Sequence, residues 1–166
     1  RSRGLGDVYK RQCYYKKKIT ITPEEAKKHI WIEFEGAMHL ADVWINGKHV
    51  MQHAGGYTPF VVDATGLLKT DKENELLVRL DNRNNSLIPP GKPLETLDFC
   101  YYGGIYRNVH LIAKADVHIT HPILDGHPAG AGIFITYPKV SQELSVVDAK
   151  TEIKNTSDKE KVVELR

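Results

Sequence analysis

Residues 40–51 read LADVWINGKHVM, and this stretch decides the fold class. Ala41, Val43 and Ile45 alternate with other side chains, which is the period of a strand that buries one face. Asn46-Gly47 follows directly, and this pair accepts the positive φ angles of a type I′ turn. The stretch therefore predicts a β-hairpin with its turn at 46–47.

The same period of two recurs on both sides of this hairpin, between Gly, Asn, Asp and Pro residues. Further strands are predicted within 14–22, 30–36, 58–69, 75–81, 105–114, 117–120, 132–138, 144–155 and 161–166. One short helical turn is expected after Thr22, which is a plausible cap ahead of Pro23. Seven or more short strands without a long helix predict an all-β sandwich.

The chain divides into three parts by composition. Residues 1–12 lack an apolar period and are expected to be a leader foreign to the fold; they do not have the pattern of a signal peptide. Residues 13–116 form the first predicted sandwich, and 117–166 read as the opening of a second antiparallel sandwich. Because a predicted strand begins at 161, we expect this second unit to be incomplete.

Charge and composition exclude several classes of protein. The formal net charge is +2, of which +3 lies in the first twelve residues, so the remaining chain gives no general attraction to nucleic acid. The sequence has no run of ~18 apolar residues, so no membrane-spanning helix is predicted. Cys13 and Cys100 are too few for a disulfide framework. The cellular compartment stays open.

The sequence contains no complete catalytic or metal motif. The strand rise places the α-carbons of Glu33 and Glu35 about 6.6–6.8 Å apart, a spacing that a glycosidase pair could use. The alternation, however, places both side chains on the polar face. Its eight histidines, among them His110, His118, His121 and His127, lack the spacing of a zinc site. No G-x-S-x-G elbow is present, and Gly55-Gly56 and Gly103-Gly104 lack the setting of a phosphate loop.

Binding has better candidates than catalysis. Trp31 and Trp44 are expected on the polar sides of neighbouring strands, followed by His49 and Tyr57, where they form either a packing face or a platform for sugar rings. Asp98 stands among aromatic residues in LDFCYYGGIYR (97–107). Its carboxylate could accept hydrogen bonds from sugar hydroxyls, help to hold a cation, or cap the local turn.

Four blocks carry a resemblance to a known family: FEGAMHLADVWINGKHV, HAGGYTPFVVDATGLLK, ENELLVRLDN and DFCYYGGIYRNVHLI. In this order and spacing, over residues 13–116, they resemble the N-terminal sugar-binding domain of glycoside hydrolase family 2. Within that family, the resemblance is nearest to the β-galactosidases. The resemblance implies a jelly-roll (galactose-binding-like) β-sandwich, and residues 117–166 resemble the first strands of the immunoglobulin-like domain that follows it.

The resemblance also implies a function. Family members are retaining exo-glycosidases whose two catalytic glutamates lie in a downstream (β/α)8 barrel, and neither Glu33 nor Glu35 matches them. Asp98 occupies the position of a family carboxylate that reaches sugar hydroxyls and, in some galactosidases, a monovalent cation. Arg107 of the Gly-Ile-Tyr-Arg motif at 104–107 is expected to brace a turn or an interface.

The expectation is thus a non-catalytic part of an enzyme acting on terminal β-galactosides, with Asp98 as its substrate-binding residue and no cofactor of its own. Its partners would be the sugar and the barrel domain. A β-glucuronidase or β-mannosidase parent, a stand-alone carbohydrate-binding module on the Trp31/Trp44 face, and a structural sandwich that assembles as a homo-oligomer remain as alternatives.

Overall fold

The computed structural model describes residues 12–93, 96–97, 101, 103–127 and 131–165. The chain forms two compact units, Arg1–Ala113 and Lys114–Arg166. Strands dominate both units, as the period of two predicts, and the helix in the described residues is the short α2, Pro23–Ala26. Thr22 caps it as predicted: its hydroxyl accepts from the Glu25 amide, and the Glu25 carboxylate accepts from the Thr22 amide.

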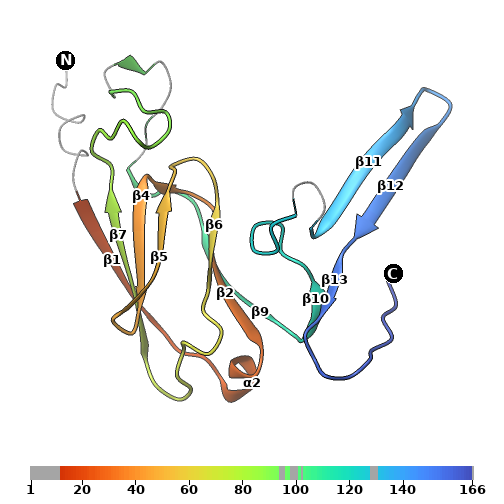
Figure 1. Cartoon of the computed structure of the whole chain (residues 1–166), viewed down its shortest axis with the longest axis horizontal. Helices are drawn as coiled ribbons and strands as arrows, with labels where there is room; N and C mark the ends of the chain where they lie inside the picture. Colours follow the sequence, from red (N-terminus) through yellow and green to blue (C-terminus); the bar gives the residue numbers. More distant parts are fainter. Residues whose placement is uncertain (1–11, 94–95, 98–100, 102, 128–130, 166) are drawn as a thin grey trace. The chain divides into compact units, whose positions relative to one another are not determined.

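Unit 1 is a sandwich of two antiparallel sheets with a small added ribbon (Figure 1). The four-stranded sheet has the order β1 (Gln12–Ile19), β7 (Asn74–Asp81), β4 (Leu40–Ile45) and β5 (Lys48–Ala54). The three-stranded sheet has the order β6 (Phe60–Asp63), β2 (His29–Phe34) and β9 (Val109–Lys114). The ribbon pairs β3 (Ala37–Met38) with β8 (Gly104–Ile105).

Alternate residues of both sheets form the core between them. Phe34 of β2 stacks on Phe60 of β6 with ring centroids 4.6 Å apart, and Phe34 is fully buried. Eight further members are aliphatic side chains at every second position of three strands: Ile30 and Ile32, Ala41, Val43 and Ile45, and Leu76, Val78 and Leu80. The alternation predicted from the sequence is therefore confirmed in β2, β4 and β7, and the all-β sandwich is confirmed with it.

The β4–β5 hairpin turns at the predicted pair. Asn46 and Gly47 have φ angles of 51° and 80°, the left-handed values that a type I′ turn requires. Nδ2 of the Asn46 side chain donates to Oδ1 of Asn74 at 2.8 Å, and Oδ1 of the same side chain accepts from the Glu75 backbone amide at 3.0 Å. The turn is thereby attached to the start of β7, the strand that pairs with β4.

Strand β1 begins at Gln12, the last residue of the predicted leader, and Gln12 pairs with Asp81 across the sheet.

Strand β5 carries a bulge that the sequence pattern does not reveal. Met51 opposes Val43, whereas His49 opposes Trp44, so one extra residue lies in β5 between these pairs.

Unit 2 consists of two antiparallel ribbons. Strand β10 (Val117–Ile119) pairs with β13 (Ile153–Asn155), and β11 (Ile133–Val140) pairs with β12 (Ser145–Thr151). The strand predicted at the end of the chain is wrong: residues 161–165 form no strand, and Val162 is fully exposed. Its apolar residues make no ladder because no neighbouring strand in the described part of the chain pairs with them.

Candidate functional site

A small polar cavity lies at one end of the four-stranded sheet, where β7 ends and β4 begins. Leu40 and Asp81 are cross-strand partners there, and residues of the loop after β7 contribute to the lining. The cavity has a volume of about 230 Å³. Its lining is His39, Leu40, Asp81, Arg83, Asn84 and Asn85.

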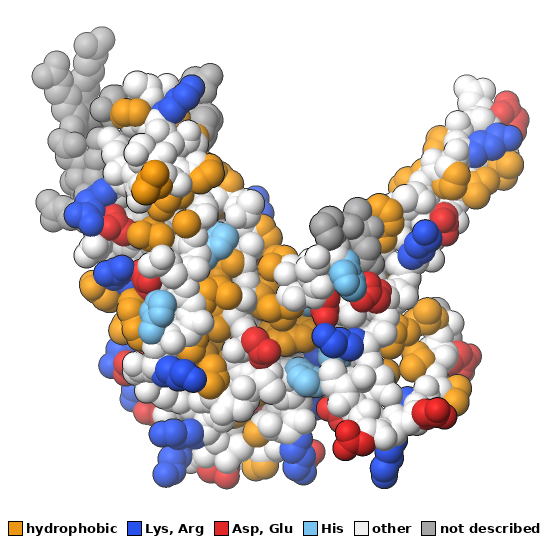
Figure 2. Space-filling model, viewed as in Figure 1, with side chains coloured by type: hydrophobic (Ala, Val, Ile, Leu, Met, Phe, Trp, Pro, Cys, Tyr) orange, Lys and Arg blue, Asp and Glu red, His pale blue; other side chains and the backbone are white. Residues whose placement is uncertain are grey.

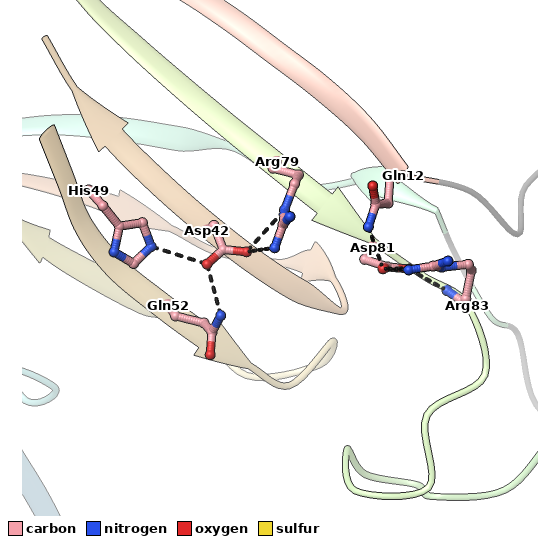
Figure 3. A network of polar contacts seen from close by, with 7 residues as sticks. All are labelled: Gln12, Asp42, His49, Gln52, Arg79, Asp81 and Arg83. Carbon is pink, nitrogen blue, oxygen red and sulfur yellow. Dashed lines mark hydrogen bonds and ion pairs between the residues drawn. The ribbon is translucent and has the colours of Figure 1, made fainter. Parts of the chain in front are cut away.

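Asp81 is the charged centre of this lining. Nε of Arg83 donates to Oδ1 of Asp81 at 2.9 Å, and Nη2 of Arg83 donates to Oδ2 at 2.5 Å. The side-chain amide of Gln12 donates to Oδ2 at 3.0 Å (Figure 3). The Arg83 hydrogen bonds, which outweigh the opposing effect of burial, hold the pKa of Asp81 far below its usual range. The carboxylate is therefore ionised and its charge is balanced by Arg83.

His39 forms the buried side of the cavity. Its ring Nδ1 contacts the hydroxyl of Tyr101, and the two rings meet edge to face with centroids 5.9 Å apart. Burial lowers the pKa of His39, with Asp81 acting against it, so the imidazole is neutral near pH 7. Burial also raises the pKa of Tyr101 to about 12, which keeps its hydroxyl protonated.

Asp98, the substrate-binding residue predicted from the sequence, lies outside the described residues, as do its neighbours Phe99, Cys100 and Tyr102. The chain on its C-terminal side is anchored at two points: Tyr101 contacts His39, and the Tyr106 hydroxyl donates to the Gly56 carbonyl at 2.5 Å.

Gly104 and Arg107 lie in the same segment. Gly104 has a φ of 75°, and a Cβ atom built there would overlap the Tyr15 hydroxyl, so glycine is required at the β3–β8 pair. Arg107 is exposed, and its charge acts on Glu35. Arg107 is not among the residues that line the cavity, and its bracing role stays a prediction.

Glu33 and Glu35 do not form an acid–base pair of the kind that glycosidases use. Oε1 of Glu35 is 2.9 Å from Nε2 of His110, and its other oxygen accepts from the Asn108 amide. The hydrogen bond from His110 is the main cause that lowers the pKa of Glu35, whereas a general acid needs a raised one. Glu35 thus links the end of β2 to β9.

The tryptophan platform considered from the sequence is wrong as a single surface. Trp31 lies in β2 and Trp44 in β4, which belong to different sheets, and Trp31 is 5% exposed. Trp44 is half-buried and meets His49 edge to face at 5.0 Å. Trp31 lies outside the core cluster, as the alternation predicts, but its side chain is buried rather than exposed.

A second polar network lies on the four-stranded sheet, and the sequence analysis missed it. Nη2 of Arg79 donates to Oδ2 of Asp42 at 2.6 Å, and the side chains of His49 and Gln52 contact Oδ1 at 3.1 and 2.8 Å (Figure 3). Arg79 and Gln52 each pair with Asp42 across neighbouring strands, so correct strand order and register would have revealed the cluster.

Within the described residues, no group of three or more His, Cys, Asp or Glu side chains could hold a metal ion. No helix in the same residues is long and apolar enough to cross a membrane.

Comparison with known proteins identifies the family. Residues 7–115 match the family model described as glycosyl hydrolases family 2, sugar binding domain. The chain belongs to glycosyl hydrolase family 2.

Curated family 2 relatives carry two kinds of name. A β-glucuronidase of Bacteroides fragilis is 34% identical over 157 residues, which are 92% of this chain and 20% of that protein. A β-galactosidase of Thermoanaerobacter pseudethanolicus is 36% identical over 151 residues, or 89% of this chain and 20% of that protein. The chain spans about a fifth of the length of these relatives.

Solved family 2 structures share the fold. Bacteroides uniformis β-glucuronidase 2, covalently bound to cyclophellitol-6-carboxylate aziridine, aligns with a TM-score of 0.75 and 34% identity over 90% of this chain and 17% of that one. A putative β-galactosidase from Bacteroides fragilis aligns with a TM-score of 0.75 and 32% identity over 90% of this chain and 21% of that one.

Proposed function

We propose that this chain is the sugar-binding part of a retaining family 2 exo-glycosidase that hydrolyses terminal β-galactosides. The observation that supports this most strongly is the family match over residues 7–115, which spans the whole sandwich and the segment that carries Asp98. In the proposal Asp98 forms one wall of the sugar pocket, and the two catalytic glutamates belong to another domain of the same protein.

The choice of a β-galactoside rests on the resemblance of four sequence blocks to the β-galactosidases, and the polar cavity agrees with it. The polar cavity holds one ion pair, Asp81 with Arg83, and a neutral histidine, so its described lining offers no unbalanced positive charge to a uronate. The relatives include proteins named β-glucuronidase as well as β-galactosidase, and a β-glucuronidase is therefore the second candidate. A β-mannosidase is the third alternative that the test below must address.

The test uses the protein encoded by the complete gene, assayed with the p-nitrophenyl β-glycosides of galactose, glucuronic acid and mannose. The proposal predicts that kcat/KM is highest for the galactoside. A preference for the glucuronide or the mannoside would overturn the proposed β-galactoside specificity but not the membership of family 2. Hydrolysis of none of the three would overturn the proposed function.

The 166-residue chain itself is predicted to hydrolyse nothing, because neither Glu33 nor Glu35 is a catalytic glutamate. Steady turnover of the galactoside by the rigorously purified chain would contradict this. If the gene encoded no further domain and its product were inactive, a stand-alone carbohydrate-binding module would be favoured instead.

A further inference from the structure

The cavity at the end of the four-stranded sheet has the chemistry of a hydroxyl-binding site. Its lining is polar apart from Leu40 and combines one carboxylate, one guanidinium, two amides and an imidazole. Its volume of about 230 Å³ is below the ~300–1,000 Å³ of pockets that bury a whole drug-sized ligand. It would therefore take one edge of a sugar ring rather than a complete oligosaccharide.

Arg83 is fixed and still able to donate. Its Nε and Nη2 hold Asp81 in a two-pronged ion pair, which sets the plane of the guanidinium. The Nη1 amino group makes no hydrogen bond to the described residues. A side chain that is already ordered loses little conformational entropy when a ligand hydroxyl binds to it.

His39 supplies a second polar atom that suits a hydroxyl. With Nδ1 engaged by Tyr101, Nε2 is the remaining hydrogen-bonding atom of the ring. In a neutral imidazole this atom either donates or accepts, depending on the tautomer. A hydroxyl satisfies both cases because it donates and accepts, whereas a carboxylate satisfies only the first.

We propose that this cavity, formed by His39, Asp81, Arg83 and Asn85, binds neighbouring hydroxyls of a neutral sugar. The ligand class rests on the proposed function, and the location rests on the geometry of the described residues alone. The cavity discriminates against uronates because Arg83, the cation among its described lining residues, is already paired with Asp81.

The experiment is a titration of the isotopically labelled 166-residue chain followed by NMR. Methyl β-D-galactopyranoside is expected to shift the amide signals of Leu40, Arg83, Asn84 and Asn85 and the ring signals of His39, with millimolar affinity. Methyl β-D-glucuronide is expected to bind no more tightly. Signal dispersion in the unliganded spectrum reports whether the chain is folded.

Two variants make the assignment specific. Arg83→Gln removes the guanidinium and is expected to weaken galactoside binding about tenfold, the loss of one charged hydrogen bond. Lys16→Gln is the matched control: Lys16 forms an ion pair of the same length with Glu75, and its side chain is 60% exposed against 61% for Arg83. It should leave the affinity unchanged.

The proposal is overturned by an absence of binding, by unchanged affinity in Arg83→Gln, or by shifts confined to Trp44 and His49. Tighter binding of the glucuronide would overturn the preference for a neutral sugar. If the cavity fails while the protein from the complete gene hydrolyses galactosides, the cavity assignment falls and the proposed function stands.

Discussion

Asp42 and Asp81 are both shielded from solvent in unit 1, and an arginine holds each of them. The Asp42 side chain is 5% exposed and that of its partner Arg79 is 31% exposed. Burial by itself would raise the pKa of Asp42, but the hydrogen bonds from Gln52, Arg79 and His49 outweigh it and lower that pKa. The carboxylate is charged because of these partners, so its stability depends on them.

Removing one partner of this buried pair should therefore cost more than removing both. We expect Arg79→Met to lower the free energy of unfolding by about 3 kcal/mol, since it leaves a buried carboxylate without its cation. Arg79→Met combined with Asp42→Leu should recover most of that loss. Urea unfolding at pH 7 measures both, and a double variant no more stable than the single one would contradict the explanation.

Asp81 makes the stability of unit 1 sensitive to acid. Its pKa is lowered in the folded state by the hydrogen bonds from Arg83, with burial opposing them. Such a group contributes its full stabilisation above the unfolded-state pKa of ~3.9, and this is lost as the pH falls toward the folded-state pKa. We expect the free energy of unfolding to fall between pH 5 and pH 2.

In Asp81→Asn this fall should be shallower, because the side chain no longer titrates. Asp71→Asn, a change in an exposed loop residue, is the control and should retain the slope of the unmodified chain. Equal slopes in Asp81→Asn and the unmodified chain, measured by urea unfolding across this pH range, would show that Asp81 is not the group involved.

Among the elements of unit 1, the short β3–β8 ribbon depends on Gly104. Gly104 combines a left-handed φ of 75° with close approach to Tyr15. We expect Gly104→Ala to lower the free energy of unfolding by more than the ~1–2 kcal/mol that the left-handed conformation alone costs. Thermal and urea unfolding both report this loss.

Gly66→Ala is the matched control for that prediction, because Gly66 has a φ of 72° with open space around it. It should show the cost of the left-handed conformation and nothing more. Tyr15→Phe removes the overlapping hydroxyl and should rescue part of the Gly104→Ala defect. Equal losses at the two glycines would mean that Tyr15 plays no part.

Elements with a complete local pattern could be predicted from the sequence. The β4–β5 hairpin follows from the alternation of Ala41, Val43 and Ile45 and from the Asn46-Gly47 turn, and the cap of α2 follows from Thr22 and Pro23. The terminal strand failed because an apolar run forms a strand only with a neighbour, and neighbours are a property of the fold.

The cavity could not be predicted, since its residues come from two segments, 39–40 and 81–85, that lie far apart in the sequence. His39 and Asp81 meet only because β4 pairs with β7. Likewise, Trp31 and Trp44 share a pattern but belong to different sheets. Periodicity assigns a side chain to a face, while strand order decides what covers that face.

For the whole molecule, the two units differ in how much of their apolar surface they bury. Unit 1 has two sheets around a shared core, whereas unit 2 presents two ribbons whose apolar residues, such as Ile133, Ile135 and Tyr137, are largely exposed. The proposed function places both in a longer glycosidase, with the sandwich contributing to the sugar pocket through Asp98.

The most direct test of this account is kcat/KM for p-nitrophenyl β-galactoside, measured on the protein from the complete gene with and without Asp98→Asn. The account predicts a fall of about 10- to 100-fold, the loss of a charged hydrogen bond to a sugar hydroxyl, with an unchanged unfolding midpoint. Unchanged kinetics in the folded variant would contradict it, because Asp98 would then have no part in the sugar pocket.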